Sequence, residues 1–316
     1  MTSVETAPVR QQLGSAYGRA LAIALTSAAA FGLSGALARS LLDLGWTPAA
    51  VVVVRICGAF AVLLVPCIVL LRRIGMPNRR QTGRMVLYGI IAVGGAQLCY
   101  FSAVQYLSVG VALLLEYSAP ILLIGYHWVR SRKRPTLPVL LGAGLSIIGL
   151  VLVLDLRDGF NLNPIGVAWG LAAALCLCGY FVLSEGSDSG NDVHPLLLTT
   201  VGLGVGGVAV LCVGALGILP LAARTGSVQL AGVAAAWWLP MLTLVLVSGA
   251  FSYLTGIIAV RRLGSSIASF VALTEVIFAV VFAFILLGQQ PAFIQLIGGA
   301  LVLTGIAVVQ RREPAA

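Results

Sequence analysis

An ionisable residue and a proline interrupt one of the most apolar stretches of the chain, the segment LLLEYSAPILL at residues 113–123. A charged side chain near the centre of a bilayer costs roughly 3 kcal/mol or more, so Glu116 needs a reason to be there. Pro120 follows four residues later and lacks the amide that would bond the carbonyl of Glu116. The carboxylate and the freed carbonyl then form a polar spot on one helix face. This favours a backbone that lines a cavity rather than lipid.

Arg55 and Glu275 are also ionisable and also lie deep inside apolar segments. Arg55 lies roughly 10 Å and Glu116 roughly 12 Å from the same side, and Glu275 lies roughly 16 Å along its own helix, near the midplane. Because intramembrane charges mark functional sites by default, we predict that Arg55 and Glu116 face a central cavity. The alternative is a structural ion pair that fixes helix packing. Arg39 lies at a segment end, where its side chain is expected to reach the interface.

Polar and small side chains on neighbouring segments extend this candidate site. Tyr100, Tyr117 and Tyr180, with Gln97 beside Tyr100, lie deeper than interfacial anchors and are predicted to hydrogen-bond a solute. Beside Glu275, small residues recur at helical spacing, which suits either close helix packing or a narrow path. These residues are Ala268, Ala272, Ala279 and Ala283.

The sequence gives little support for a nucleotide-binding site, a metal site or an enzyme active site. Residues 201–210 contain a GxGxxG pattern, but it lies inside an apolar segment without a preceding strand, so close helix packing is the better interpretation. Lys133 is the only lysine, and no Gly-Lys-Ser/Thr sequence exists. His127 and His194 have no carboxylate at the spacing of a metal-ligand pair. We expect no cofactor, no metal and no enzymatic activity; a membrane enzyme acting on lipid-linked substrates would need interfacial Asp/His clusters that the sequence lacks.

The composition places these residues in a membrane. Of the 316 residues, 60% are hydrophobic and 9% are charged, and the mean hydropathy is +1.06. A soluble domain has about 25% charged residues. We therefore predict an all-α polytopic membrane protein with the lipid bilayer as a partner. The net charge of +9 comes from arginine clusters between apolar runs, which indicates cytoplasmic loops and no nucleic-acid partner.

Ten segments are long enough to span a bilayer, which takes about 20 mostly apolar residues. The run at 85–129 is too long for one crossing and is divided at Leu107-Ser108. The predicted spans are Ala20–Leu42, Pro48–Leu71, Met85–Leu107, Ser108–Val129, Pro138–Leu154, Ile165–Leu183, Leu196–Leu219, Trp238–Val260, Ser266–Leu287 and Ala292–Val309.

The two halves of the chain resemble each other. Residues such as Ala103, Gly142 and Gly149 have identical counterparts 156 positions later, and Gly32 and Pro48 have counterparts 147 positions later. We predict two repeats, residues 20–155 and 165–310, between cytoplasmic tails at 1–19 and 311–316.

An odd number of spans in each repeat inverts the second copy in the membrane. The loop Arg132-Lys133-Arg134 aligns with Gly288-Gln289-Gln290, so equivalent loops differ in positive charge, as inversion requires. We therefore predict ten transmembrane helices in two inverted five-helix repeats, with both termini on the cytoplasmic side of a bacterial inner membrane. The loop from Glu185 to His194 is acidic but keeps its cytoplasmic assignment, because acidic residues weigh little in this rule.

This arrangement resembles the EamA branch of the drug/metabolite transporter superfamily. Similar motifs are Phe31-Gly32-Leu33-Ser34, Val54-Arg55-Ile56 and Thr274-Glu275-Val276-Ile277. The stretch from Leu115 to Pro120 is similar to the threonine/homoserine exporter-like amino-acid exporters of the branch. The family often has Leu-Gly-Glu and Glu-Pro near the ninth span, where this chain has Gln289 and Val276.

Without an ATP site, the chain is expected to be a secondary transporter that exports a small polar metabolite, such as an amino acid, by alternating access. Arg55 and Glu116 suit the two ends of a zwitterion. Glu275 is predicted to couple protons, because Glu116 is expected to be held ionised by Arg55, whereas Glu275 has no basic residue within a helical turn. Efflux of cationic or hydrophobic drugs is the alternative function. A second copy of the chain, in a homodimer, is a candidate partner, and the sequence does not fix the oligomeric state. The sequence does not name the substrate.

Overall fold

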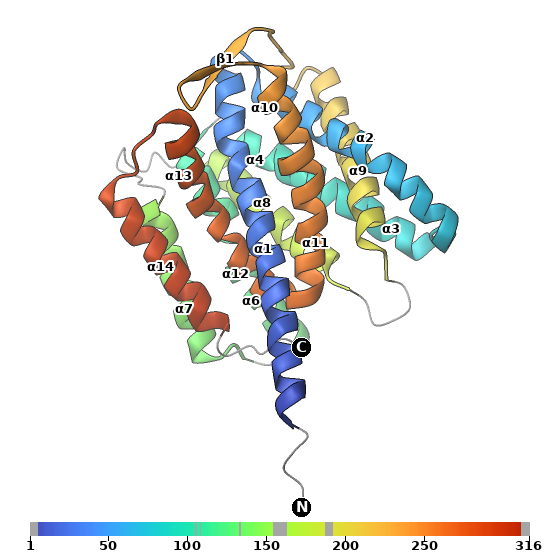
Figure 1. Cartoon of the computed structure of the whole chain (residues 1–316), viewed down its shortest axis with the longest axis vertical. Coiled ribbons are helices and arrows are strands. Elements are labelled where there is room, and N and C mark those ends of the chain that lie inside the picture. Colours follow the sequence, from blue (N-terminus) through green and yellow to red (C-terminus); the bar gives the residue numbers. More distant parts are fainter. Residues whose placement is uncertain are drawn as a thin grey trace, which may run out of the picture.

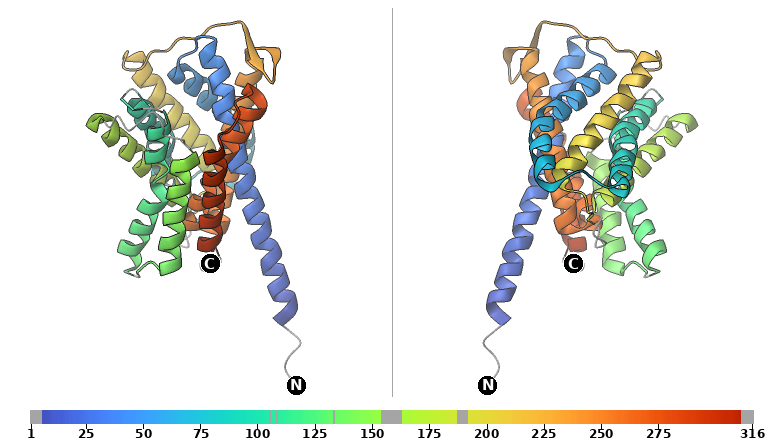
Figure 2. Two further views of the ribbon diagram at one scale, coloured as in Figure 1. Left: turned by 90° about the vertical axis from the view of Figure 1, so that its left-hand side faces the viewer. Right: turned by 90° about the vertical axis from the view of Figure 1, so that its right-hand side faces the viewer.

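The computed structural model describes residues 6–104, 106–107, 109–132, 134–153, 163–186 and 192–310. Its helices form a bundle in which α1 (Thr6–Asp43) begins at the same end at which α14 (Phe293–Gln310) finishes (Figures 1 and 2). We call this end the base. The strands β1 (Ser227–Leu230) and β2 (Val233–Ala236) pair antiparallel at the other end, the hairpin end, with Ser227 opposite Ala236.

The other helices follow the predicted spans closely. They are α2 (Pro48–Ile74), α3 (Arg79–Tyr88), η1 (Gly89–Gly95), α4 (Ala96–Val104), α5 (Val109–Glu116), α6 (Ala119–Ser131), α7 (Leu137–Val153), α8 (Pro164–Ser184), α9 (Pro195–Ala215), α10 (Trp238–Thr243), η2 (Leu244–Phe251), α11 (Ser252–Leu263), α12 (Ser265–Ala272) and α13 (Thr274–Leu287). The predicted third span corresponds to the continuous run α3–η1–α4, and the eighth to α10–η2–α11. The hairpin was not predicted.

Within the described residues, seven helices are long and apolar enough to cross a membrane, and two shorter apolar helices, Leu137–Val153 and Phe293–Val309, accompany them. The seven are Ala16–Asp43, Pro48–Ile74, Ala112–Ser131, Pro164–Ser184, Pro195–Ala215, Trp238–Leu263 and Ser265–Leu287. Large apolar side chains such as Val65, Leu175 and Val208 are 61–68% exposed on their outer surfaces. Such a surface is unfavourable in water and suits lipid, so the chain is a multi-pass membrane protein.

Local sequence sets where several helices begin. Proline occupies the first turn of α2, α8 and α9, where the missing amide costs no hydrogen bond. Asn163 caps α8, because its side-chain oxygen accepts from the amide of Ile165 at 2.9 Å. Asn78 and Gln81 form a reciprocal capping box at the start of α3. These local signals determine the residue at which each of these helices begins, which the hydrophobic pattern alone does not specify.

Both halves contain a π-helical segment at the same place. The segment η1 spans seven residues and η2 spans eight, and they are related by the same offset of 156 positions. They also have equivalent neighbours, since η1 packs against α9 and η2 packs against α2. Long π-helical runs are rare in proteins and often lie near functional sites. Their repetition extends the resemblance of the halves from sequence to backbone conformation.

The helices α7 and α14 lie side by side and touch at glycines (Figure 1). A β-carbon at Gly149 would lie 2.6 Å from the carbonyl oxygen of Gly298, and one at Gly298 would lie 2.6 Å from the carbonyl oxygen of Gly149. Gly142 and Gly305 approach each other in the same way. Gly142 has Gly298 as its sequence counterpart and Gly149 has Gly305, so each repeat presents the same surface to the other.

This close contact makes Gly149 sensitive to substitution. We expect Gly149→Ala to lower the melting temperature of the purified protein and to cost about 1–3 kcal/mol, because the new methyl group meets backbone atoms that cannot rotate away. Gly144→Ala on the same helix is the matched control, since nothing lies within 4 Å of the position of its β-carbon. Equal melting temperatures for the two variants would contradict the packing described here.

Candidate functional site

A cavity of about 740 Å³ runs from the middle of the bundle to the hairpin end. Its lining reaches the hairpin ends of α1, α2 and α13 at Leu42, Pro48 and Leu287, whereas towards the base it stops near Ala24 and Val260. All seven of the predicted site residues line it, from both halves of the chain: Arg55, Gln97, Tyr100, Glu116, Tyr117, Tyr180 and Glu275.

Both acids of the cavity lie at helix breaks. Glu116 is the last residue of α5, and Glu275 lies in the first turn of α13, directly after the break at Leu273. Tyr117 follows Glu116 in the first break and is the counterpart of Leu273 at the 156-position offset, so the two breaks are equivalent. The predicted interruption before Pro120 is confirmed. The second break forms without a proline, because Val276 stands at that place.

At each break, a side-chain hydroxyl donates to a backbone carbonyl of the preceding helix. The Ser118 hydroxyl donates to the carbonyl of Leu115 at 2.6 Å, and the Thr274 hydroxyl donates to the carbonyl of Val271 at 2.7 Å. Both pairs are counterparts at the same offset. Such bonds compete with regular helix bonding and stabilise irregular backbone away from water. The two breaks are therefore built features of the fold.

The helix α1 closes one wall of the cavity against the second break. A β-carbon at Gly32 would lie 2.7 Å from the carbonyl oxygen of Glu275, so only glycine allows this approach. The Ser27 hydroxyl donates to the carbonyl of Ser252 at 2.8 Å, and the Ser248 hydroxyl donates to the carbonyl of Ala30 at 2.7 Å. These bonds tie α1 to η2 and α11.

The alternative of a structural ion pair between Arg55 and Glu116 is not realised. In the described ranges, the ion pairs are Arg39–Asp43 at 2.9 Å, which is largely exposed at the end of α1, and Arg261–Asp192 at 3.0 Å at the base. Similar depth along two helices therefore did not make Arg55 and Glu116 partners, because depth does not fix the direction of a side chain around its helix axis.

The charge of Arg55 acts on the other acid. Its electrostatic attraction reaches Glu275, which also interacts with the hydroxyl of Tyr117. The electrostatic neighbours of Glu116 are Glu275 and Cys99, not Arg55. The two carboxyl groups are thus close enough to influence each other, and the arginine balances Glu275 more than Glu116.

Arg55 carries a guanidinium group with one buried donor, Nε, that has no hydrogen-bond partner among the described residues. Its guanidinium carbon lies 5.8 Å from the ring centroid of Phe31, which packs edge-on against Tyr253 at 5.0 Å. A buried donor without an acceptor costs about 1–3 kcal/mol, and more when it is charged. The position therefore suits an anionic group that arrives through the cavity.

Tyr253 is a cavity residue that the sequence prediction did not select. It is the counterpart of Gln97 at the 156-position offset, and the two side chains interact. The repeat offset is therefore the signal that points to it. Tyr253 also packs against Tyr180, with ring centroids 6.3 Å apart. Three further lining residues that were not selected are Phe31, Gln289 and Gln295.

Small side chains leave the space that the cavity occupies along α12 and α13. The alanines predicted either to pack closely or to border a narrow path all line the cavity, and a β-carbon at Gly32 would lie 3.0 Å from the backbone nitrogen of Ala279, so this face also packs closely. These alanines are Ala268, Ala272, Ala279 and Ala283. Larger side chains on this face would fill the cavity beside Glu275.

Comparison with known proteins gives a consistent result. The model of the EamA-like transporter family matches residues 18–155 and 164–311. An uncharacterized transporter from Archaeoglobus fulgidus is 28% identical over 303 residues, which are 93% of this chain and 97% of that protein. The threonine/homoserine exporter RhtA of Salmonella typhimurium is 26% identical over 243 residues, 75% of each chain. A solved structure titled only as the crystal structure of a protein matches 93% of this chain with a TM-score of 0.74 at 18% identity, which indicates a shared fold.

Proposed function

The chain belongs to the EamA-like transporter family, and from this premise we propose that it is a secondary exporter of a small zwitterionic metabolite such as an amino acid. That it is a membrane transporter follows from the family match over both halves. The substrate class is our inference, supported by the cavity and by the relative named as a threonine/homoserine exporter.

The observation that supports this proposal most is the buried Nε of Arg55, for which the described part of the chain offers no acceptor. Arg55 lines a cavity that is also lined by two glutamates. A zwitterion presents an anionic carboxylate and a cationic ammonium group. The carboxylate would accept from Arg55 in a charge-assisted hydrogen bond, and the ammonium group would lie against Glu275 or Glu116. Tyr117 and Gln97 would complete the donors and acceptors around the solute.

Proton coupling is assigned to the two carboxyl groups. Export against a gradient needs an energy source, and a carboxyl group in a low-dielectric site can exchange a proton with solvent. The proton role of Glu275 stays a prediction. By the same reasoning Glu116 is a second candidate, because it forms no ion pair with Arg55 among the described residues, whereas the attraction of Arg55 reaches Glu275. We propose that one acid exchanges protons while the other holds the solute with Arg55.

The equivalent helix breaks, the paired π-helical segments and the reciprocal contact of α7 with α14 support ten spans in two inverted repeats. We propose that the hairpin end is periplasmic and the base cytoplasmic. The beginning of α1 and the end of α14 both lie at the base, which agrees with an even number of crossings. The cavity then opens to the periplasm, in an outward-open state of an alternating-access cycle.

Single cysteines test this topology. In a cysteine-free background, a membrane-impermeant thiol reagent added to intact cells should label Gly288→Cys and should leave Lys133→Cys unlabelled until the cells are opened. Gly288 ends α13 at the hairpin end, and Lys133 lies outside the described residues, between α6 and α7. Labelling of both positions from the same side would rule out the inversion.

Efflux of cationic drugs is the second candidate. The cavity holds two acids and a cluster of aromatic rings, which also suits a cation with an apolar body. This function would use the glutamates without Arg55.

A growth screen distinguishes the two functions. Cells that overproduce the protein are grown with toxic amino-acid analogues and with cationic drugs. Rescue from the analogues supports the proposal, and rescue from the drugs alone contradicts it.

A further inference from the structure

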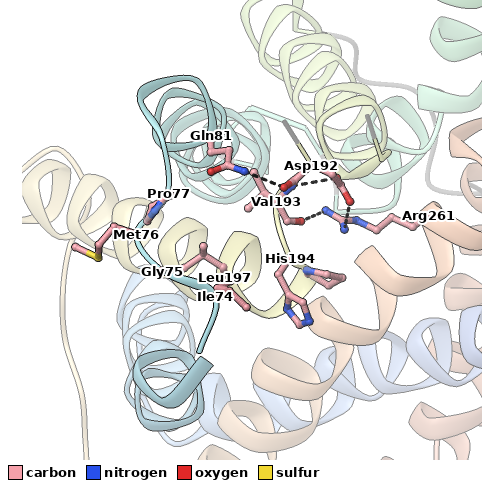
Figure 3. Close-up of a pocket in the computed structure, with 11 residues that line it drawn as sticks. Ile74, Gly75, Met76, Pro77, Gln81, Asp192, Val193, His194, Leu197 and Arg261 are labelled. Atoms are coloured by element: carbon pink, nitrogen blue, oxygen red, sulfur yellow. Dashed lines mark hydrogen bonds and ion pairs between the residues drawn. The ribbon is translucent and has the colours of Figure 1, made fainter. Parts of the chain in front are cut away.

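At the base of the bundle, a polar network surrounds the end of α8 and the start of α9. It contains Glu185 and Asp192, the acidic residues that fitted poorly with a cytoplasmic loop in the sequence. Side chains or amides of neighbouring helices bind both carboxylates, so these charges have partners within the protein. The network lies beyond the last lining residues of the large cavity and borders a separate pocket of about 370 Å³ (Figure 3).

Arg261 at the end of α11 binds three acceptors of this segment. It forms the ion pair with Asp192 at 3.0 Å and donates to the carbonyl of Val193 (Figure 3). It also donates from Nε to the carbonyl of Ser184 at 3.3 Å. The three acceptors come from both sides of the connection between α8 and α9. Arg261 therefore fixes the distance between these two helices and α11.

Side chains of α3, in the first half of the chain, donate hydrogen bonds to the same segment. Arg84 donates from Nη2 to the carbonyl of Leu183 at 2.8 Å and also donates to the carbonyl of Glu185. Gln81 donates to the backbone carbonyl of Asp192 at 3.0 Å. Because α3 belongs to the first repeat and α8 to the second, these bonds join the two halves at the base.

A third connection runs through α12 to α6. The Glu185 carboxylate accepts from the amide and the hydroxyl of Ser265 at 3.1 Å and 3.2 Å. The Ser265 hydroxyl also lies 2.9 Å from Nε2 of His127 in α6. Five helices and the α8–α9 connection thus meet in one set of hydrogen bonds and one ion pair.

The hairpin end has no equivalent charged network at the corresponding positions. The sequence counterpart of Arg84 is Pro240 and that of Ser265 is Val109 at the 156-position offset, and the counterpart of Glu185 is Ala38 at the 147-position offset. The contacts at that end include a largely apolar cluster that contains Leu41, Trp46, Val51, Val228 and Met241. The two ends of an otherwise repeated structure therefore have different contacts, charged at the base and largely apolar in this cluster at the hairpin end.

We propose that this network is a latch that holds the base shut while the cavity is open at the hairpin end, and that its bonds must break before solute can enter from the base. The latch consists of Arg84, Arg261, Glu185, Asp192, Ser265 and His127. This inference rests on the alternating-access cycle of the proposed function. It adds that the cycle is biased towards the hairpin-open state by this network, whose sequence counterparts at the hairpin end include the non-polar residues Pro240, Val109 and Ala38.

The test measures thiol labelling in nanodiscs, where reagent reaches both faces, so it depends on neither the topology nor the substrate. The probe at the base is Ser184→Cys in a cysteine-free background, a nearly isosteric change at a fully buried side chain. We expect Arg261→Gln to increase its labelling rate about tenfold, because the rate follows the population of the base-open state. Arg262→Gln, at the exposed neighbouring position, is the matched control and should leave the rate unchanged.

A second probe separates opening of the whole base from local loosening. With Arg84→Gln and Arg261→Gln combined, we expect labelling of Ala279→Cys, which lines the large cavity, to slow several-fold as the hairpin end closes. Unchanged labelling at Ala279→Cys, or a Ser184→Cys probe that stays unreactive in a stable Arg261→Gln protein, overturns the latch. If Arg261→Gln does not fold, Ser265→Ala replaces it with the same expectations. Failure to find a transported solute leaves these readouts intact and bears on the proposed function alone.

Discussion

Replacement of Arg55 with methionine should abolish transport of a zwitterionic solute and leave the protein folded. The variant keeps most of the side-chain volume and removes a buried donor that has no acceptor among the described residues, so the melting temperature should not fall. Removing one partner of a buried charged contact costs about 2–5 kcal/mol, which corresponds to a loss of roughly 30-fold to several thousand-fold in rate. The measurement is the initial rate of solute exchange in proteoliposomes, normalised to the reconstituted protein.

Arg39→Gln is the matched control for this experiment. Arg39 also lines the cavity, but its side chain is 63% exposed and paired with Asp43 at the hairpin end, where ion pairs contribute about 0–1 kcal/mol. Its exchange rate should stay close to that of the unmodified protein. If Arg55→Met moves amino acids normally and also moves cations, the carboxylate-binding role is wrong and cation efflux becomes the better function.

Neutralising the proton-carrying acid should separate solute exchange from the response to a pH gradient. In proteoliposomes, an imposed pH gradient should drive solute movement by the unmodified protein. Glutamine at the proton-carrying position cannot take up or release a proton, so the pH gradient should lose its effect while solute-for-solute exchange continues. Glutamine at the solute-holding position should instead lower both solute-for-solute exchange and the solute movement that the pH gradient drives. Glu275→Gln and Glu116→Gln are measured in parallel, because the structure leaves both carboxyl groups next to the cavity.

The surface acid Asp43 provides the control for the glutamates. Asp43→Asn removes a carboxylate that is 58% exposed and should change neither exchange nor drive. An unmodified protein that ignores the pH gradient would contradict proton coupling as a whole and favour facilitated or exchange transport.

Much of the fold can be predicted from the sequence, because hydrophobic length and the 156-position repeat are strong local signals. Most helix ends agree with the predicted spans within a few residues, although α1 begins at Thr6 and α3 at Arg79, well before the predicted starts at Ala20 and Met85. The break before Pro120 follows from the missing amide. The π-helical segments and the break at Leu273 could not be predicted in this way. They arise where two halves pack against each other, at Gly89 against α9 or at Gly32 against the backbone of Glu275. The hairpin was missed because its strands are only four residues long.

For the candidate site, the sequence predicts which residues face the cavity but not how they pair with one another. Ionisable residues in apolar segments had to face the interior, and all seven selected residues line one cavity. Their pairing was not predictable, because it depends on how each helix is rotated about its axis. Arg55 acts on Glu275, although its depth matched that of Glu116. Tyr253 shows that aligning the repeats more fully would have added a cavity residue, since its counterpart Gln97 was already selected.

The central claim is that the solute occupies the cavity beside Arg55, Glu116 and Glu275, and protection from labelling tests it most directly. The reaction of Ala279→Cys with an impermeant thiol reagent is measured with and without a solute identified by the growth screen. Leu216→Cys, 75% exposed at the end of α9 and outside the cavity lining, is the control. We predict that the solute slows labelling at Ala279→Cys in proportion to its occupancy and leaves Leu216→Cys unchanged. Equal labelling of Ala279→Cys at saturating solute, in protein that still transports it, would show that the solute takes another route.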